Sequence, residues 1–386
     1  MAKKLSRLLY LGTENGKEIR KRITADTLRE LNAKENKLKA EYNAGRDVMS
    51  TPLFGVWADK WYNAQCSDIC KGTATMYQSA ITHLNNRFER VDMREIGLDD
   101  VQSLINDLAR ENPNTKKPTA KATLENINKV CGKIFHYAHS CKVAGVDDFH
   151  RDIKIPKTAP ENKRRALTPE EIQRIIETPH RAQIIAMIMT FAGLRDSEVV
   201  ALKWRNVNLT RGYIKVCESA PFYDNRASEK QGGKTENATR IVPLPKILVD
   251  FLREYKESEK ILSQYVCTTQ KGEQLTKSGW RRIWESYMRE LNLKYGLKGS
   301  YSKYTPKALP MLIEPFTPYY CRHTFATLCF LEDLPITTAK QICGHADIQT
   351  TINIYADLKN YSKADLPESF RNRLSSDFHI PEMLTA

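Results

Sequence analysis

Residues 151–167 break this chain into two parts, because they show no apolar periodicity and contain two prolines and three consecutive cations. These residues are Pro156, Pro160, Lys163, Arg164 and Arg165. The next four residues read Thr-Pro-Glu-Glu, with Thr168 at an N-cap, a proline at the first helical position and Glu171 at capping-box spacing. The pattern predicts a basic linker over 151–167 and a new domain from residue 168.

The charge balance favours a polyanionic partner. The 386 residues include 60 Lys and Arg against 46 Asp and Glu, a formal net charge of +14, and nucleic acid is the simplest partner for such a surplus. No segment approaches the ~20 apolar residues of a membrane-spanning helix, and the longest apolar run, 184–194, predicts a buried core helix. The first residues carry no apolar stretch of the secretory type. We therefore expect a cytoplasmic protein with no membrane partner.

The nine cysteines are scattered, without the spacing of a disulfide framework or a zinc site. Cys66 and Cys70 are close in sequence, but no second pair of Cys or His follows at ligand spacing. We expect reduced thiols, and neither a metal nor another cofactor.

The first fifty residues predict a small basic module. Residues 6–11 and 18–24 are short β-type runs around Asn-Gly, a favoured hairpin turn, and Asp26 is placed to cap the helix that follows. Cations on this hairpin suit contacts with DNA phosphates, although a solvated basic surface is an equally good interpretation. These cations are Arg7, Lys17, Arg20, Lys21 and Arg22.

The rest of the chain predicts one helical and one mixed domain. Four apolar stripes at helical spacing within 51–150 indicate a small bundle of four amphipathic helices. Over 168–375 helices alternate with short strands, of which 213–216 and 240–244 are β-like, and 376–386 form a tail. The predicted fold class is multidomain: a small β-hairpin-plus-helix N-terminal module, an all-α bundle, and a mainly α, mixed α/β domain.

Four segments of the last domain hold residues that can break and rejoin a phosphodiester. Arg195 and Arg322 can bind the two non-bridging oxygens in fork geometry and stabilise a pentacoordinate transition state. Lys234, on a polar turn, can protonate the departing 5′-oxygen, and the hydroxyl of Tyr355 can attack the phosphate and hold it as a covalent ester. His345 completes the set, and this chemistry requires no metal.

Each of these residues has a simpler interpretation when it is taken alone, as a surface charge, a cap or a packing residue. The functional interpretation prevails because they occur as an ordered set. Glu198, one turn after Arg195, is expected to orient a basic group, and His323 to be a buried, hydrogen-bonded helix residue. Tyr361 is a rival nucleophile, but it lies outside the segment that contains Tyr355.

These segments resemble the tyrosine recombinases of the phage integrase family. The family pattern has an Arg in GLRxxE, a Lys before RxVPL, an HxxRHTFAT helix, a Gly-His turn and, nine or ten residues on, a Tyr. The matching residues of this chain are Gly193-Leu194-Arg195 with Glu198, Lys234 with 240–244, 322–327, Gly344-His345, and Tyr355. By these motifs the resemblance covers approximately residues 165–375.

The chain departs from the family pattern at one catalytic position. Tyr319 stands where the family has the His of HxxR, three residues before Arg322 and so on the same face of a helix. A tyrosine hydroxyl has an ordinary pKa near ~10, which makes it a poor general base at neutral pH. Tyr319 is therefore expected to donate a hydrogen bond to a phosphate oxygen.

The resemblance implies a site-specific recombinase of a bacterial prophage or other mobile element. It implies a homotetramer on double-stranded attachment sites, a 3′-phosphotyrosyl intermediate, and an excisionase or host DNA-bending protein as accessory partner. It implies an arm-type DNA-binding module at 1–50, a helical, SAM-like core-binding domain at 51–150, the basic linker at 151–167 and a catalytic domain at 168–375. In the linker, Lys163, Arg164 and Arg165 are the expected DNA contacts.

Two other functions fit parts of the sequence. A sequence-specific DNA-binding protein with impaired catalysis would explain Tyr319, although all five other groups are present. A type IB topoisomerase-like enzyme would use similar groups without a partner site, but the N-terminal hairpin module favours the recombinase.

Overall fold

A computed structural model of the protein describes residues 4–14, 17–43, 52–67, 69–143, 146, 152–161, 165–223, 225–227, 230–231, 239–258, 263–297, 309–331, 334–344, 347–349 and 352. The chain forms two compact units, residues 1–162 and 163–386, and each is described by itself. Within the described part of the chain, no helix is long and apolar enough to cross a membrane.

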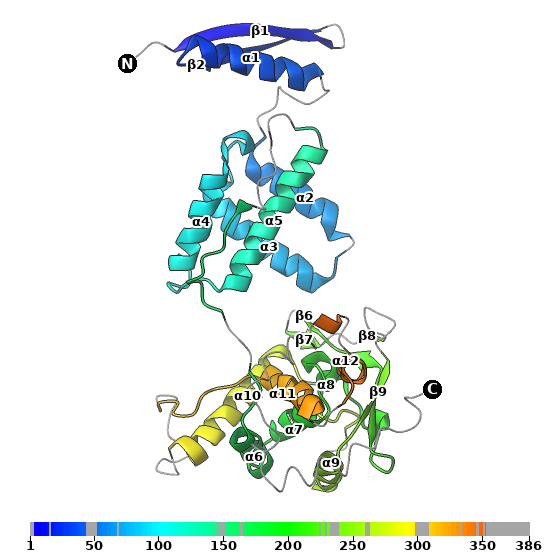
Figure 1. Cartoon of the computed structure of the whole chain (residues 1–386). Helices are drawn as coiled ribbons and strands as arrows, with labels where there is room; N and C mark the ends of the chain where they lie inside the picture. Colours follow the sequence, from blue (N-terminus) through cyan, green and yellow to red (C-terminus); the bar gives the residue numbers. More distant parts are fainter. Residues whose placement is uncertain are drawn as a thin grey trace. The chain divides into compact units, whose positions relative to one another are not determined.

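The chain begins with a hairpin that is covered on one face by a helix (Figure 1). Strand β1 (Leu5–Glu14) pairs antiparallel with β2 (Lys17–Ala25), and α1 (Leu28–Asn43) follows. The hydroxyl of Thr27 accepts a backbone N–H from the first turn of α1, that of Glu30, at 3.2 Å. The cap is therefore Thr27 and not the expected Asp26, because the helix begins one residue later and places Thr27 at the N-cap position.

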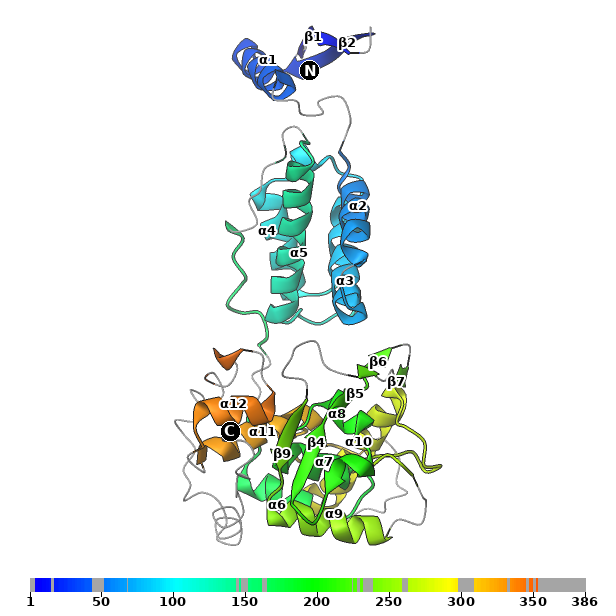
Figure 2. The ribbon, with the colours of Figure 1, turned by 90° about the vertical axis from the view of Figure 1, so that its right-hand side faces the viewer.

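Four helices form the bundle that the apolar stripes predicted, and Figure 2 shows α5 beside α3 and α4. The helices are α2 (Phe54–Cys66), α3 (Lys71–Phe88), α4 (Leu98–Arg110) and α5 (Lys121–Ser140). Their stripes meet in one core that contains Phe54, Leu84, Ile105 and Ile134.

The second unit is built around α7 (Gln183–Phe191), all of whose residues are buried. This confirms the core helix expected from the longest apolar run. It packs against α6 (Pro169–Glu177), α8 (Asp196–Ala201), α9 (Lys246–Ser258) and α11 (Pro318–Leu331). The unit also contains α10 (Lys277–Leu291), a π-helical turn (Asn292–Gly296) and α12 (Ile336–Cys343).

The predicted capping box is present at the start of α6. The hydroxyl of Thr168 accepts the N–H of Glu171 at 3.3 Å, and the carboxylate of Glu171 accepts the N–H of Thr168 at 2.8 Å. Because both ends of the box are satisfied, the helix starts at the residue that the sequence indicated.

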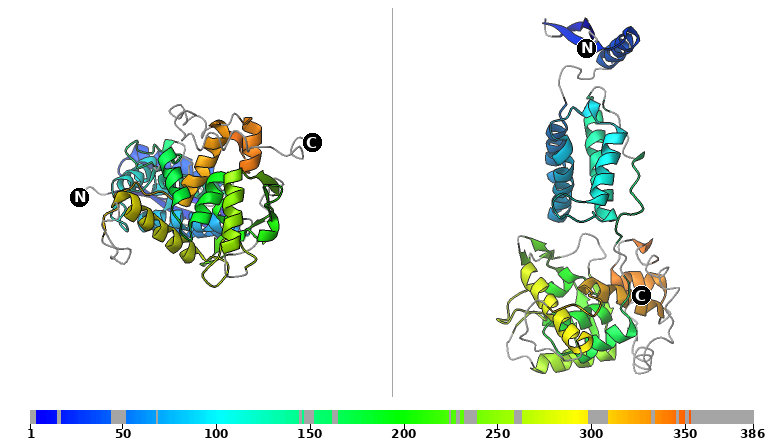
Figure 3. Two further views of the ribbon diagram at one scale, coloured as in Figure 1. Left: turned by 90° about the horizontal axis from the view of Figure 1, so that it is seen from below. Right: turned by 90° about the vertical axis from the view of Figure 1, so that its left-hand side faces the viewer.

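A three-stranded antiparallel sheet lies at one edge of this unit (Figure 1 and the left view of Figure 3). Its order is β3 (Val207–Asn208), β4 (Tyr213–Val216) and β9 (Arg240–Pro243). Strands β4 and β9 lie at the positions of the two expected β-like runs, whereas β3 was not expected. Ile214 and Val242 pair across the sheet and are fully buried against the core. The last pair in this ladder, Val216 with Arg240, brings Arg240 to the inner face as well.

The segment between β4 and β9, for which the sequence indicated no element, contains two further short ladders. They are β5 (Glu218–Ser219) with β8 (Lys230–Gln231), and β6 (Phe222–Tyr223) with β7 (Arg226–Ala227). The N–H of Ala220 donates to the carbonyl of Ser197 in α8 at 2.8 Å, and Asn225 accepts the N–H of Ser278 in α10 at 2.8 Å. These two hydrogen bonds connect the segment between β4 and β9 to α8 and α10.

Candidate active site

Three arginines meet around one carboxylate in the second unit. Arg195 precedes the first residue of α8, Arg240 is the first residue of β9, and Arg322 lies in α11. The carboxylate belongs to Glu198, in the first turn of α8. We call these four residues the arginine cluster.

Arg195 is held by its own helix and by the C-terminal end of α12. Its backbone N–H and its Nη1 donate to Glu198 at 2.8 and 2.7 Å, and its Nη2 donates to the carbonyl of Gly344. The side chain is nevertheless 38% exposed, so it can still reach a ligand. Gly193 permits the turn before it: φ is +62°, and a Cβ there would lie 2.2 Å from the ring of Phe325.

Arg322 is almost completely buried. Its Nη1 donates to the carbonyl of Gly193, and its Nη2 donates to the carbonyl of Cys343 at 2.6 Å. Burial lowers the pKa of this guanidinium, and the nearby charge of Arg195 adds to the effect, whereas the carboxylate of Glu198 opposes it. An arginine stays charged under ordinary conditions, so the site keeps a cation in its interior.

Arg240 and Glu198 form a buried bidentate ion pair. Nη1 and Nη2 of Arg240 donate to the two oxygens of Glu198, each at 2.8 Å, and its Nε donates to the carbonyl of Ile342 at 2.8 Å. Burial by itself raises the pKa of Glu198, but the hydrogen bonds from Arg240 and the charges of the three arginines outweigh it and lower the pKa to about 2.

Gly344 ends α12 in the left-handed conformation, with φ at +66°. A Cβ on this residue would lie 2.9 Å from Cζ of Arg240, so both the backbone conformation and the available space require glycine. The conformation explains the glycine of the Gly-His turn in structural terms.

The arginine cluster has the charge of an anion site. Three guanidiniums against one carboxylate leave two positive charges, in a region where burial strengthens electrostatic interactions. All three guanidiniums donate to carbonyl oxygens at the end of α12, those of Ile342, Cys343 and Gly344. Donors that converge in this way suit a phosphodiester, whose two non-bridging oxygens accept hydrogen bonds from two guanidiniums.

The structure brings together two of the six catalytic residues expected from the sequence, Arg195 and Arg322. Tyr319 lies in the first turn of α11 and is 39% exposed. His323, expected to be buried, is only partly buried, because it lies on a different face of α11 from Arg322. Other expected residues lie outside the described residues: Lys163, Arg164, Lys234, His345, Tyr355 and the rival Tyr361.

Sequence reasoning gave Arg240 no role, although it belongs to the segment that follows Lys234. The available signal was a charged residue at the start of an otherwise apolar strand, at a position whose pattern directs it inward. A buried charge needs a partner, and the only way to identify Glu198 as that partner was to know the tertiary contact.

The cations expected to bind DNA have different surroundings. On the hairpin, Arg7 donates to Asn32 at 3.1 Å and also pairs with Glu35, both in α1. Arg20 and Arg22 are exposed on the hairpin, and Lys21 is partly buried. Nothing is described of the Lys17 side chain.

Arg165 is engaged with two carboxylates of its own unit. It pairs bidentately with Glu171 at 2.7 and 2.8 Å and reaches Glu314 at 2.8 Å, and these hydrogen bonds raise the pKa of Arg165 above its ordinary value. Its guanidinium is therefore occupied in fastening the end of the linker to α6.

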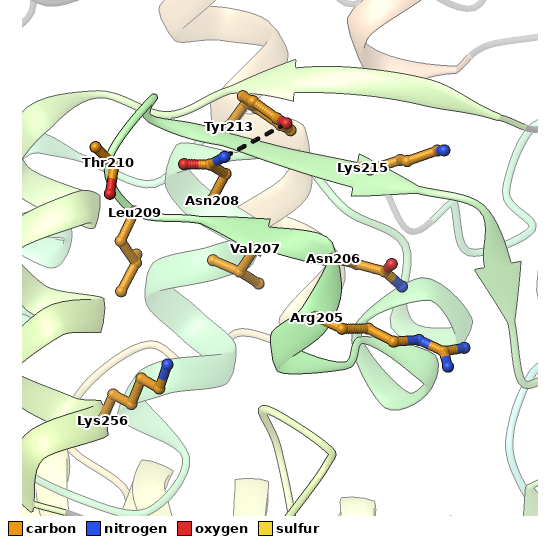
Figure 4. Close-up of a pocket in the computed structure, with 9 residues that line it drawn as sticks. All are labelled: Arg205, Asn206, Val207, Asn208, Leu209, Thr210, Tyr213, Lys215 and Lys256. Carbon is orange, nitrogen blue, oxygen red and sulfur yellow. Dashed lines mark hydrogen bonds between the residues drawn. The ribbon is translucent and has the colours of Figure 1, made fainter.

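A polar pocket of about 350 Å³ lies apart from the arginine cluster, none of whose members lines it (Figure 4). Arg205, Lys215 and Lys256 contribute cations from the turn before β3, from β4 and from α9, and no acidic residue is among the described residues that line it. The remaining lining residues are Asn206, Val207, Asn208, Leu209, Thr210 and Tyr213.

The chain is similar to known proteins of one family. The model of the phage integrase family matches residues 165–361, about half of the chain. The tyrosine recombinase XerA of Thermococcus kodakarensis is 31% identical over 211 residues, which cover 54% of this chain and 63% of that protein. The chain thus spans less than two thirds of the length of this relative.

Two solved structures share the fold. The integrase of the Tn1549 transposon, in complex with a circular intermediate DNA, superposes with a TM-score of 0.60 at 16% identity, over 79% of this chain and 95% of that one. The lambda integrase tetramer bound to a Holliday junction gives a TM-score of 0.55 at 14% identity, over 88% and 89% of the two chains.

Proposed function

Because the chain belongs to the phage integrase family, we propose that it is a site-specific DNA recombinase that integrates or excises a mobile element. The observation that carries this proposal is the arginine cluster, which places Arg195 and Arg322 within one hydrogen-bonded network and leaves a surplus of positive charge. That network joins the two family motifs that hold these arginines, although they are far apart in sequence.

The proposed reaction exchanges one phosphate ester for another. The hydroxyl of Tyr355 gives up its proton to solvent and its oxygen bonds to the phosphorus, while the bond to the 5′-oxygen breaks and Lys234 supplies the proton that this oxygen takes up. Arg195 and Arg322 stabilise the charge on the non-bridging oxygens in the transition state. His345, which follows Gly344 in the sequence, is proposed to hydrogen-bond the same phosphate. A 5′-hydroxyl then attacks the 3′-phosphotyrosine and rejoins the strand.

The proposed substrate is double-stranded DNA with attachment sites, and the proposed assembly is a homotetramer. Support comes from the solved relatives, which are bound to a circular intermediate DNA and, as a tetramer, to a Holliday junction. The domain limits, an accessory excisionase or DNA-bending protein, and a cytoplasmic location in a bacterium belong to the same proposal.

The N-terminal module is proposed to bind separate, arm-type DNA sites. Its hairpin has one face covered by α1 and one face that α1 leaves open, and the open face carries Arg20 and Arg22. Exposed cations on a strand pair suit contacts with the phosphates that flank a groove.

The experiment that tests the reaction is Tyr355→Phe, assayed on a nicked half-site that traps the covalent adduct. The change removes only the attacking oxygen, so we expect DNA affinity to be kept and the adduct to disappear. Mass spectrometry of the wild-type adduct should place DNA on Tyr355, and Tyr361→Phe, as the matched control, should keep the adduct.

Other outcomes of the same assay would contradict the proposal. A wild-type protein that binds its site but forms no adduct is a DNA-binding protein without catalysis. Relaxation of any supercoiled plasmid, without attachment sites, would indicate a topoisomerase. An adduct on Tyr361 would overturn the assignment of the nucleophile.

A further inference from the structure

We propose that Arg240 is a positioning residue of this active site, which locks Arg195 and the end of α12 into the geometry required for cleavage. The inference rests on the proposed function, because its measure is the rate of DNA cleavage. Arg240 itself does not contact the DNA: its side chain is only 5% exposed, and three of its nitrogens already donate within the protein.

The contacts of Arg240 join three separate segments of the active site. Arg240 begins β9, the strand that follows the segment of Lys234. Two of its nitrogens bind Glu198 in α8, and the third binds the carbonyl of Ile342, near the end of α12. Gly344 lies directly against the guanidinium, which leaves no room for a Cβ. One planar side chain therefore fixes the spacing between α8, β9 and α12.

Arg240 also determines how far the charge of the Arg195 guanidinium is neutralised by Glu198. Glu198 binds both arginines, but Arg240 engages both of its oxygens, while the side chain of Arg195 engages only one. With Arg240 present the cluster has two surplus positive charges, and without it only one. Without Arg240, we expect Glu198 to draw the Arg195 guanidinium fully into a bidentate pair and away from the phosphate.

Lysine cannot replace arginine in this role. The ammonium group keeps the charge, but it is a compact point donor without the planar fork that reaches both oxygens of Glu198 and the Ile342 carbonyl at once. Arg240→Lys therefore removes the geometry and keeps the charge. We expect it to slow cleavage about 100-fold, the usual result of misplacing a reacting group by about 1 Å, with unchanged affinity for DNA.

The test is single-turnover cleavage of a nicked half-site at saturating DNA, with the folded fraction measured under the same conditions. The matched control is Tyr287→Phe, which removes another buried hydrogen bond of the same core, from the Tyr287 hydroxyl to the carbonyl of Ile175 at 3.2 Å. We expect this control to cleave at the wild-type rate. Wild-type cleavage by folded Arg240→Lys would overturn the inference.

A double variant separates positioning from a purely structural role. If Arg240 acts through Arg195, the loss in the Arg195→Lys, Arg240→Lys protein should be well below the product of the two single losses. A loss equal to that product would overturn the inference. If the Arg240→Lys protein does not fold, the pair Arg240→Met, Glu198→Met replaces it, because apolar side chains often substitute for a buried ion pair without loss of stability. Slow cleavage by the folded double variant then supports the inference, and cleavage at the wild-type rate overturns it.

Failure of the proposed recombinase function gives a different result from failure of the inference about Arg240. In that case the wild-type protein forms no covalent adduct at any concentration of DNA. The inference about Arg240 fails when the wild type cleaves and the folded variants cleave equally well.

Discussion

At the scale of single residues, Tyr319 and Arg322 lie one helical turn apart but differ sharply in exposure to solvent. Arg322 is 3% exposed and donates to two carbonyl groups, whereas Tyr319, three residues earlier, is 39% exposed. The i, i+3 spacing places both residues on one face of α11, and we propose that the Tyr319 hydroxyl reaches the phosphate that Arg322 binds. A hydroxyl at that position can donate to a phosphate oxygen.

We expect Tyr319→Phe to slow cleavage by roughly 10²–10³, the usual loss when one donor to a developing oxyanion is removed. Tyr319→His should retain activity or improve it near neutral pH, because an imidazole can serve as an acid or a base there. The measurement is single-turnover cleavage of a nicked site across pH. Tyr320→Phe, which removes the neighbouring hydroxyl from a different helix face, is the control. An unchanged rate for Tyr319→Phe would assign this residue to packing.

Glu198 should make stability depend on pH in the acid range. Its pKa is about 2 in the folded protein, below the ordinary value of 4.5, so its contribution is present above pH 4.5 and is lost as pH falls toward 2. This corresponds to about 3 kcal/mol of unfolding free energy. We expect Glu198→Gln to lower the unfolding free energy at pH 6 and to reduce its dependence on pH below 4.5. Urea unfolding of both proteins at several pH values checks this, and parallel curves would contradict it.

At the scale of elements, the hairpin shows how strand register sorts cations onto two faces. Leu9 pairs with Lys21, and Leu9 is buried on the side of α1. Tyr10 pairs with Arg20 directly beside them, so these two side chains share the opposite, exposed face, together with Arg22. Alternation along the strands therefore assigns Arg20 and Arg22 to the face that α1 leaves open.

We expect Arg20→Gln, Arg22→Gln to weaken binding of DNA that carries arm-type sites, because two phosphate contacts are lost. The slope of log affinity against log salt should fall in magnitude by about 2. The charge-matched control is Arg29→Gln, Lys37→Gln, which removes two exposed cations from α1. Equal weakening in both double variants would show that only the total charge matters and that the hairpin face makes no specific contact.

At the scale of the whole molecule, the surplus of 14 positive charges is the property that favours association with a polyanion. The structure shows that part of the basic side chains are already neutralised within the protein, as Arg7 is by Glu35 and Arg165 by Glu171. These ion pairs leave the net charge unchanged, but they occupy individual cations, so the count of 60 Lys and Arg overstates the number of cations available to DNA.

We expect binding of the full chain to its site to weaken steeply with salt, with a slope of about −0.9 per phosphate contacted. Lysine and arginine side chains displace counterions from the duplex, and the gain from this release falls as the salt concentration rises. Affinity measured by fluorescence anisotropy at several salt concentrations checks the slope. A flat response would contradict binding that is dominated by phosphate contacts.

The features that the sequence determined by itself depend on near neighbours in the chain. The local pattern correctly predicted two features: the capping box of Thr168 and Glu171, and the buried helix α7. Both depend on residues only a few positions apart, because a helix start and an apolar period are set within one or two turns. Arg195 and Arg322 were also found from sequence, but through family motifs and not through geometry.

Only the tertiary structure decided which charges face each other. Arg240 and Glu198 are 42 residues apart, and Arg165 and Glu314 are 149 apart, so no local pattern links either pair. The same holds for the carbonyl groups of Gly344 and Ile342 at the end of α12, which bind Arg195 and Arg240 from 149 and 102 residues away. A side chain's charge is fixed by its type, but its partner is fixed by the fold, because desolvation makes an unpaired buried charge too costly to keep.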